Sequence, residues 1–264
     1  MGKLSEHIYR SEAVVLRRMD LGEADRILTL YTPTFGKLRA VAKGVRKPAS
    51  KLGGHLELFT RVKVMLARGR NLDVLTGAET LEPYRGLRGE GPAAPDDALE
   101  RIGTAYYLAE LLDRFTEEGL ENRAVWDLLV AALRALSDGV SPALVARHYE
   151  LRLLGYLGYR PGLDDCAGCG RPLQPEANAY SLEAGGVLCP ECRAQDPLAE
   201  PLSVNALKLL RLLARETPAG VVRYRLSGDL VAEVEGVLRR SIRHIAERDL
   251  ESPAVLRSLR GVAG

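Results

Sequence analysis

The sequence has only four cysteines, and aromatic residues make up just 5% of its 264 residues. It also lacks any apolar run near the roughly 20 residues that a membrane-spanning helix needs. No cleavable apolar leader follows the first residues, Met1 to Glu6. We therefore expect a cytoplasmic protein without membrane contact, in a reducing compartment where paired cysteines bind metal more often than they form disulfides.

The short motifs of common enzyme classes are missing as well. There is no GxxxxGKS/T phosphate loop, no GxGxxG after a predicted strand, no HExxH and no GxSxG, and the four histidines have no paired spacing. An acidic cluster of Asp20, Glu23 and Asp25 suggests a divalent metal site for nuclease chemistry, but turn chemistry alone explains it. We expect no catalytic residues and no small-molecule substrate.

All four cysteines fall into two CxxC pairs. Cys166 and Cys169 form the first pair, and nineteen residues separate it from Cys189 and Cys192. This spacing is typical of a tetrahedral zinc site with four thiolate ligands, and two disulfides are the alternative in a secreted protein. We predict one structural Zn²⁺ per chain, in an insertion over residues 164–195. A closed four-cysteine site organises the fold and has no open position for chemistry.

The net charge of +2 is divided unevenly along the chain. Residues 1–80 carry a net charge of +7, residues 81–165 carry −6, residues 166–200 carry −3 and residues 201–264 carry +4. The N-terminal segment is therefore the part of the chain most suited to a polyanionic partner.

The same N-terminal segment has the pattern of a small β-barrel. Short β-branched or alternating runs, separated by polar or glycine-bearing turns, predict five strands. These are residues 13–16, 27–31, 38–42, 62–66 and 72–76. Five strands in about eighty residues favour an OB-fold, which commonly binds oligonucleotides, with an SH3-like barrel or an open sheet as alternatives.

After Tyr84 the composition becomes that of a helical protein. Residues 83–95, rich in glycine, proline and alanine, resemble a linker, and amphipathic runs then predict helices. The predicted helices are 98–115, 124–136, 142–157, 204–215 and 229–248, with Asp96, Ser141 and Ser203 as N-caps and a hairpin over 180–188. We predict an α+β multidomain protein with a five-stranded OB-fold barrel over 1–82, a linker over 83–95, and a helical domain over 96–264 that contains the inserted four-cysteine zinc ribbon.

A basic stretch from Arg26 to His55 contains seven bases and no acid. Strand alternation points Leu38, Ala40 and Ala42 into the barrel. It points Lys37, Arg39 and Lys43 outward on one face, and a basic loop follows. A solvated strand edge explains any single lysine, but seven unopposed bases favour a polyanion, bound by its backbone because few aromatic residues accompany them. The predicted nucleic-acid contacts are Lys37, Arg39, Lys43, Arg46, Lys47 and Lys51.

A second basic group lies near the C-terminal end of the chain. Arg239, Arg240 and Arg243 fall on adjacent turns of a predicted helix, with Leu238 and Ile242 between them. This pattern is common on solvated helix faces, and it also suits an acidic peptide tail bound beside apolar side chains. We keep both interpretations.

Several segments resemble the RecO family of recombination mediators, and the resemblance extends from about residue 10 to residue 250. It is carried by residues 16–27, 35–46, 56–59, 149–161, 166–170 and 185–189. It implies an N-terminal OB-fold, a helical domain with a zinc ribbon, and no catalysis. The DNA contacts that carry over are Lys37, Arg39, Lys43, Arg46 and Lys47, and the zinc ligands are Cys166, Cys169, Cys189 and Cys192.

The resemblance also implies a nucleoid-associated function. Members of the family bind single- and double-stranded DNA and anneal complementary strands. With RecR they help to load RecA onto strands coated by single-stranded-DNA-binding protein. An OB-fold and zinc-ribbon nuclease or ligase stays open as the alternative.

Overall fold

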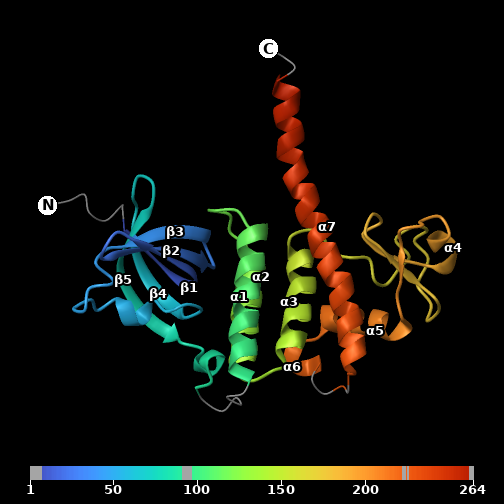
Figure 1. Ribbon diagram of the computed structural model, residues 1–264, viewed down its shortest axis with the longest axis horizontal. Helices are drawn as coiled ribbons and strands as arrows, with labels where there is room; N and C mark the ends of the chain where they lie inside the picture. Colours follow the sequence, from blue (N-terminus) through green and yellow to red (C-terminus); the bar gives the residue numbers. More distant parts are fainter. Residues whose placement is uncertain (1–7, 91–96, 222–223, 225, 262–264) are drawn as a thin grey trace. The chain divides into compact units, whose positions relative to one another are not determined.

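The computed structural model describes residues 8–90, 97–221, 224 and 226–261, and the side chains among them as far as Ala246 (Figure 1). The chain divides into two compact units, residues 1–142 and 143–264. Each unit has its own cluster of buried apolar side chains. The predicted linker lies partly outside the described residues, as does the predicted cap Asp96, and the short helix η2 (Arg85–Arg88) occupies part of the rest.

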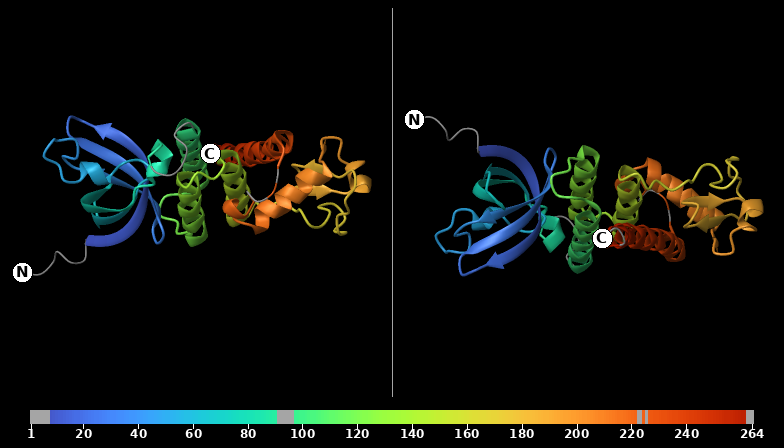
Figure 2. Two further views of the ribbon diagram at one scale, coloured as in Figure 1. Left: turned by 90° about the horizontal axis from the view of Figure 1, so that it is seen from below. Right: turned by 90° about the horizontal axis from the view of Figure 1, so that it is seen from above.

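The first unit begins with a closed barrel of five strands in the order β1-β2-β3-β5-β4 (Figures 1 and 2). Its strands are β1 (Ile8–Leu21), β2 (Asp25–Thr32), β3 (Gly36–Ala42), β4 (Arg61–Ala67) and β5 (Asp73–Glu82), with helix η1 (Gly53–His55) before β4. All neighbours pair antiparallel except β3 and β5, which pair parallel. The closed five-stranded topology confirms the predicted OB-fold over an open sheet.

Strand alternation fills the barrel as the sequence predicts. Leu28 and Leu30 of β2 and Ala40 and Ala42 of β3 are fully buried, while Leu38 packs against the same cluster with partial exposure. Alternate side chains of β2 and β3 therefore fill the barrel, while outward-facing residues such as Tyr31 and Val41 are buried on the other side of their strands.

Two helices complete the first unit, α1 (Ala98–Phe115) and α2 (Arg123–Ser137), which pack against each other. The loop between them passes directly over the start of β3. Gly36 has φ +57°, and a Cβ built on it would lie 1.9 Å from the carbonyl oxygen of Leu120. The amide of Gly119 donates to the carbonyl of Lys37 at 2.9 Å. Only glycine fits both this backbone conformation and this close approach.

The second unit is a helical body that contains the cysteine segment. Its elements are α3 (Pro142–Tyr156), β6 (Ala179–Ser181), β7 (Gly186–Leu188), α4 (Pro190–Arg193), β8 (Glu200–Pro201), α5 (Val204–Arg215), α6 (Pro218–Val221) and α7 (Gly228–Gly261). The predicted cap of α5 is confirmed, since Ser203 Oγ accepts from the amide of Ala206 at 3.0 Å. Strands β6 and β7 form the predicted hairpin.

The predicted helices agree with the structure to within two residues at each end, with one exception. Helix α7 runs 34 residues to Gly261, so its predicted end at 248 is wrong. At α1 the N-cap position is Asp97, whose side chain makes no capping bond. None of the helices in the described ranges is long and apolar enough to cross a membrane.

Candidate nucleic-acid interface and metal centre

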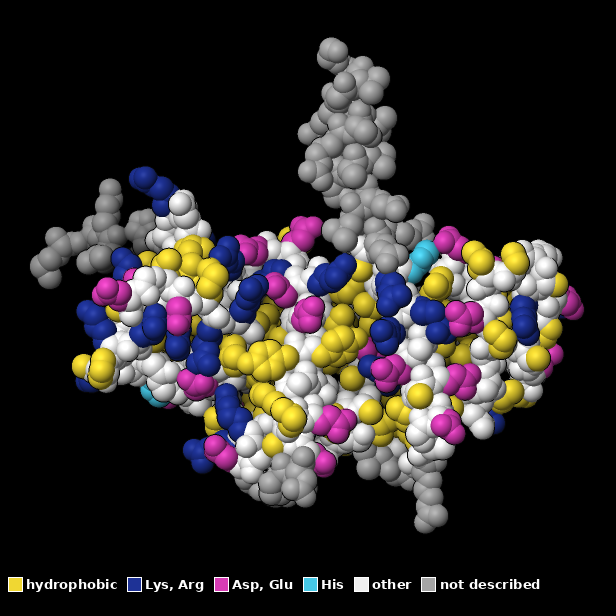
Figure 3. Space-filling view, viewed as in Figure 1, with side chains coloured by type: hydrophobic (Ala, Val, Ile, Leu, Met, Phe, Trp, Pro, Cys, Tyr) yellow, Lys and Arg dark blue, Asp and Glu magenta, His cyan; other side chains and the backbone are white. Residues whose placement is uncertain are grey.

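Basic side chains gather over the barrel on the face shown in Figure 3. Arg39 lies on β3, and Lys43, Lys47 and Lys51 lie at its end and in the following loop; all four are exposed. No carboxylate of the described residues comes within 4.0 Å of their charged nitrogens. These four cations form the basic face, and their charges stand unopposed in solvent.

The loop that carries these lysines is fixed to the turn between β1 and β2. Asp25 Oδ1 accepts from the amide of Gly44 at 2.7 Å, and the amide of Arg46 donates to the carbonyl of Ala24 at 2.9 Å. The guanidinium of Arg46 also donates to the carbonyl of Gly22 at 3.0 Å. The acidic turn of the sequence therefore braces the basic loop.

Asp20 also holds the basic loop in place, and it forms ion pairs with two bases of the basic stretch, Arg26 and Arg46. Its carboxylate lies 2.8 Å from Arg26 Nε and 3.6 Å from Arg46 Nε. The hydrogen bond from Arg26 holds the pKa of Asp20 below its usual range. Among the described residues, the acids of this turn form no group with metal-ligand spacing. Arg46, one of the predicted nucleic-acid contacts, is therefore partly neutralised by Asp20.

Lys37 lies on the predicted outer side of β3, but it does not face solvent. The residue is 8% exposed, and its ammonium group donates to the backbone carbonyl of Asp113 at 2.6 Å and to Asp113 Oδ1 at 2.9 Å. Helix α1 packs over the outer surface of β3 at this point, so this part of the outer surface is buried. Strand alternation alone cannot reveal such a cover.

The structure adds basic residues that the sequence pattern missed. Arg17 is exposed on β1 and pairs in register with Thr29 of β2, which pairs with Arg39 of β3. Three strands thus bring two arginines, distant in sequence, into one row across the outer surface of the barrel.

The loop between β4 and β5 carries two further exposed arginines, Arg68 and Arg70. The guanidinium of Arg68 lies 5.3 Å from the centre of the Tyr9 ring, within the range of a cation–π contact. The close spacing of these two bases was the one signal in the sequence that could have found them.

The four cysteines come together as predicted. Their Sγ atoms all lie within 4.8 Å of one another, and those of Cys169 and Cys189 are 3.9 Å apart. With metal–sulfur bonds of about 2.3 Å, the sulfurs of a tetrahedral site lie about 3.8 Å apart. The donor set therefore fits a tetrahedral thiolate-bound ion such as Zn²⁺, with Cys166 and Cys169 from one turn and Cys189 and Cys192 from the other.

The surroundings of Cys166 and Cys169 favour thiolates over thiols, whereas burial raises the pKa of Cys192. Burial opposes ionisation of Cys166, but amides that include those of Cys169 and Cys189 donate toward its sulfur and lower its pKa to about 6. The guanidinium of Arg171 donates to Cys169 Sγ at 3.3 Å. Fixed donors of this kind orient the sulfurs and stabilise their negative charge, as they do around metal-bound thiolates.

One of the three predicted arginines of α7 forms an ion pair. Arg240 pairs with Glu200 at 2.7 Å, whereas Arg239 and Arg243 are exposed and make no ion pair with any described side chain. Among the described side chains, the predicted three-arginine face therefore presents two charges without an ion-pair partner.

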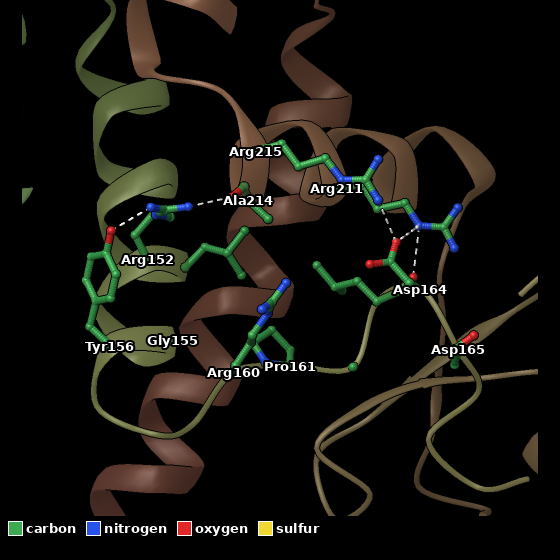
Figure 4. Close-up of a pocket in the computed structure, with 13 residues that line it drawn as sticks. Arg152, Gly155, Tyr156, Arg160, Pro161, Asp164, Asp165, Arg211, Ala214 and Arg215 are labelled. Carbon is green, nitrogen blue, oxygen red and sulfur yellow. Dashed lines mark hydrogen bonds and ion pairs between the residues drawn. The ribbon is translucent and has the colours of Figure 1, made fainter. Parts of the chain in front are cut away.

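A second basic surface lies in a hollow of about 570 Å³ between the end of α3, the loop after it and the end of α5 (Figure 4). Asp164 pairs there with Arg211 at 3.4 Å and with Arg215 at 3.0 Å. The exposed guanidinium of Arg160 points into the hollow without a partner among the described residues.

The wall of this hollow formed by α3 contributes Arg152, which donates to the carbonyl of Ala214 at 2.6 Å. The sequence pattern did not reveal this cluster, because its arginines are spread along the chain from residue 152 to residue 215. Only the folded helices bring them to one place.

Comparison with known proteins decides the family. Residues 97–254 match the family model described as "Recombination protein O C terminal", and residues 6–84 match "Recombination protein O N terminal". The chain belongs to the RecO family. It is 46% identical over 257 residues to the DNA repair protein RecO of Roseiflexus sp. (strain RS-1), covering 97% of this chain and 88% of the relative.

Other RecO relatives are similar over the same length. The DNA repair protein RecO of Dehalococcoides mccartyi is 37% identical over 254 residues, covering 96% of this chain and 97% of the relative. That of Moorella thermoacetica is 35% identical over 255 residues, covering 96% and 92%. The resemblance noted in the sequence is confirmed, and this RecO-family chain has a role in DNA repair and recombination.

Proposed function

We propose that this chain is a non-catalytic mediator that binds single- and double-stranded DNA through the outer face of its barrel and anneals complementary strands. The observation that carries the proposal is the basic face, four exposed cations without a carboxylate within 4.0 Å among the described residues. Each cation that meets a phosphate releases a condensed counterion, which favours binding irrespective of sequence.

The brace under the basic loop supports this function. Because Asp25 and Asp20 fix the loop to the barrel, its lysines lose less conformational freedom on binding than they would on a mobile tail. Annealing requires two polyanions to approach each other, and a cationic surface that contacts both lowers their repulsion without reading bases.

We propose Zn²⁺ as the ion of the four-cysteine site, with Cys166, Cys169, Cys189 and Cys192 as ligands. The site supplies structure and no open coordination position. It joins the turn before the β6–β7 hairpin to the start of α4, so the ion would hold the two ends of this segment together.

The family relationship supports a cytoplasmic, nucleoid-associated role with two protein partners, RecR and single-stranded-DNA-binding protein, in loading RecA. The acidic tail of the latter suits the exposed pair Arg239 and Arg243, or the hollow beside Arg160, where cations border apolar side chains. Replacing Arg239 and Arg243 together by glutamate, and Arg160 by glutamate separately, distinguishes the two surfaces in a tail-peptide binding assay.

The DNA-binding proposal is tested with Arg39→Ala combined with Lys43→Ala. For duplex DNA the slope of log affinity against log salt should fall by at most about 1.8, since each lost phosphate contact removes about 0.9. Annealing of complementary strands should slow in parallel. Lys208→Ala is the matched control, because Lys208 is exposed on the second unit.

An unchanged salt slope and unchanged annealing rate in the double variant would remove the basic face from the mechanism. The same preparations are incubated with Mg²⁺ and with ATP. Strand cutting or joining that depends on these additions would instead support the nuclease or ligase alternative.

A further inference from the structure

A hollow of about 490 Å³ opens beside the basic face, between β1 and α1 of the first unit. Its volume lies within the range of small-ligand pockets. Figure 3 shows apolar side chains gathered on the surface where the barrel meets the helices of this unit. The hollow is lined by Leu16, Arg17, Arg18, Thr29, Leu58, Tyr106, Ala109, Glu110 and Asp113.

Two backbone irregularities shape one wall of this hollow. The register of β1 against β2 shifts between Val15 and Arg17, which makes Leu16 the residue of a β-bulge. Phe59, which follows the lining residue Leu58, has φ +61°, an uncommon conformation for a side chain of that size. The Phe59 amide donates to the carbonyl of Val15 at 2.8 Å, so a backbone hydrogen bond links the bulge to the strained residue. Bulges and strain of this kind concentrate at binding sites, where they redirect side chains.

An aromatic ring stands exposed at the hollow. Tyr106 of α1 is 51% exposed, yet its ring is fixed edge to face against the buried Phe59, with centroids 4.9 Å apart at 86°. A ring that is exposed and also held in place offers a stacking surface at little cost in side-chain entropy. The strained backbone of Phe59 thus supports the orientation of Tyr106.

The charges around the hollow distinguish what enters it from what stays outside. Glu110 is exposed and has no ion-pair partner among the described residues, and Asp113 keeps its Oδ2 free of the bond to Lys37. Two carboxylates repel a phosphate. They accept hydrogen bonds from neutral donors such as an exocyclic amino group. Arg17 lines the hollow and lies in the cross-strand row with Arg39, where phosphates find their counter-charge.

We propose that this hollow binds one unpaired nucleobase of single-stranded DNA while the backbone of the strand follows Arg17 and Arg39. Tyr106 supplies the stacking surface, and Glu110 accepts from an exocyclic amino group. The inference rests on the proposed DNA binding and deepens it. Because the bases of a duplex are stacked and paired, the hollow favours single strands over duplexes and holds a base unpaired until a complementary strand arrives.

The test compares two ligands of equal length and charge, a normal single-stranded oligonucleotide and one in which every nucleotide is abasic. The wild-type chain should bind the normal strand about tenfold more tightly, the scale of one base stacked on an aromatic ring. Tyr106→Ala should bind both ligands equally, and Tyr106→Phe should keep the preference. Leu99→Ala is the control, since Leu99 is 83% exposed on the same helix and does not line the hollow.

A 2-aminopurine base in the normal strand gives a second measurement, because stacking on Tyr106 should quench its fluorescence in the wild type and in Tyr106→Phe only. Quenching and base preference that persist in Tyr106→Ala would overturn the proposal. If base preference persists in Tyr106→Ala while Arg39→Ala with Lys43→Ala weakens both ligands equally, DNA binding by the basic face stands and the base pocket falls. If the wild-type chain binds neither ligand, both proposals fall.

Discussion

The ammonium group of Lys37 lies 2.6 Å from the backbone carbonyl oxygen of Asp113 and 2.9 Å from its carboxylate, which ties strand β3 to helix α1 across 76 residues of sequence. The main chain of Lys37 takes part as well, since its carbonyl accepts from Gly119. One lysine therefore joins the barrel to both α1 and the loop that follows it.

Replacing Lys37 by alanine should destabilise the chain more than it weakens DNA binding. The lysine side chain is 10% exposed and the Asp113 carboxylate 43% exposed, so we expect a loss of about 1–2 kcal/mol in the free energy of unfolding. Urea denaturation measures this loss. Arg39→Ala should show the reverse pattern, stability unchanged and salt slope reduced. A Lys37→Ala variant with native stability but a smaller salt slope would show instead that Lys37 contacts DNA.

Gly36→Ala should destabilise the first unit much more than Gly22→Ala. Both glycines have φ +57°, so both substitutions carry the same conformational strain of about 1–2 kcal/mol. At Gly36 the new Cβ would also lie 1.9 Å from the backbone of Leu120, whereas at Gly22 nothing lies within 4 Å. Thermal unfolding of the two variants isolates the steric part. Equal melting temperatures would mean that the helix loop moves away from β3 at no cost.

Cys166→Ser should abolish stoichiometric metal binding and lower the stability of the second unit. Metal bound by the folded state alone contributes its binding free energy to folding, so we expect a loss of at least about 2 kcal/mol. Metal analysis by mass spectrometry and calorimetry of unfolding measure the two effects. DNA affinity should change little, because the basic face belongs to the barrel. A variant that keeps one metal per chain would exclude Cys166 as a ligand.

His148 should make the chain less stable below neutral pH. It is 8% exposed, and burial together with the nearby charge of Arg152 lowers its pKa to about 4. Between about pH 6.5 and pH 4 the unfolded chain takes up a proton that the folded chain refuses, so stability falls as the pH falls, by up to about 3 kcal/mol. Denaturation midpoints across this range should decline less steeply in His148→Gln. Parallel declines in the two proteins would assign the effect to other groups.

The predicted elements came from local signals. Short β-branched or alternating runs located all five strands, although β1 (8–21) and β5 (73–82) are longer than the predicted 13–16 and 72–76. Helix α1 was predicted at its observed bounds, 98–115, because helices bury side chains with a fixed period. The cysteine site was equally visible, since two closely spaced ligands in each of two turns need no knowledge of distant packing. The end of α7 was not, because no glycine or proline signal marks 248 as a boundary.

The proposed DNA-binding face was only partly predictable. Arg39, Lys43, Lys47 and Lys51 are exposed as expected, but no local pattern indicated that Asp113 would neutralise Lys37. Nor did the pattern reveal Arg17. Alternation from the inward-facing Ala13 and Val15 would place Arg17 inside the barrel, and the bulge at Leu16 turns it to the outer face.

By itself the sequence determined the five strands, the helices, the paired cysteines and the concentration of positive charge near the N-terminus, since each depends on residues close together in the chain. Only the tertiary structure decided which charges remain available. That outcome depends on contacts across many residues, such as Lys37 with Asp113 and Tyr106 with Phe59, and no periodic pattern records which helix covers which side of a barrel.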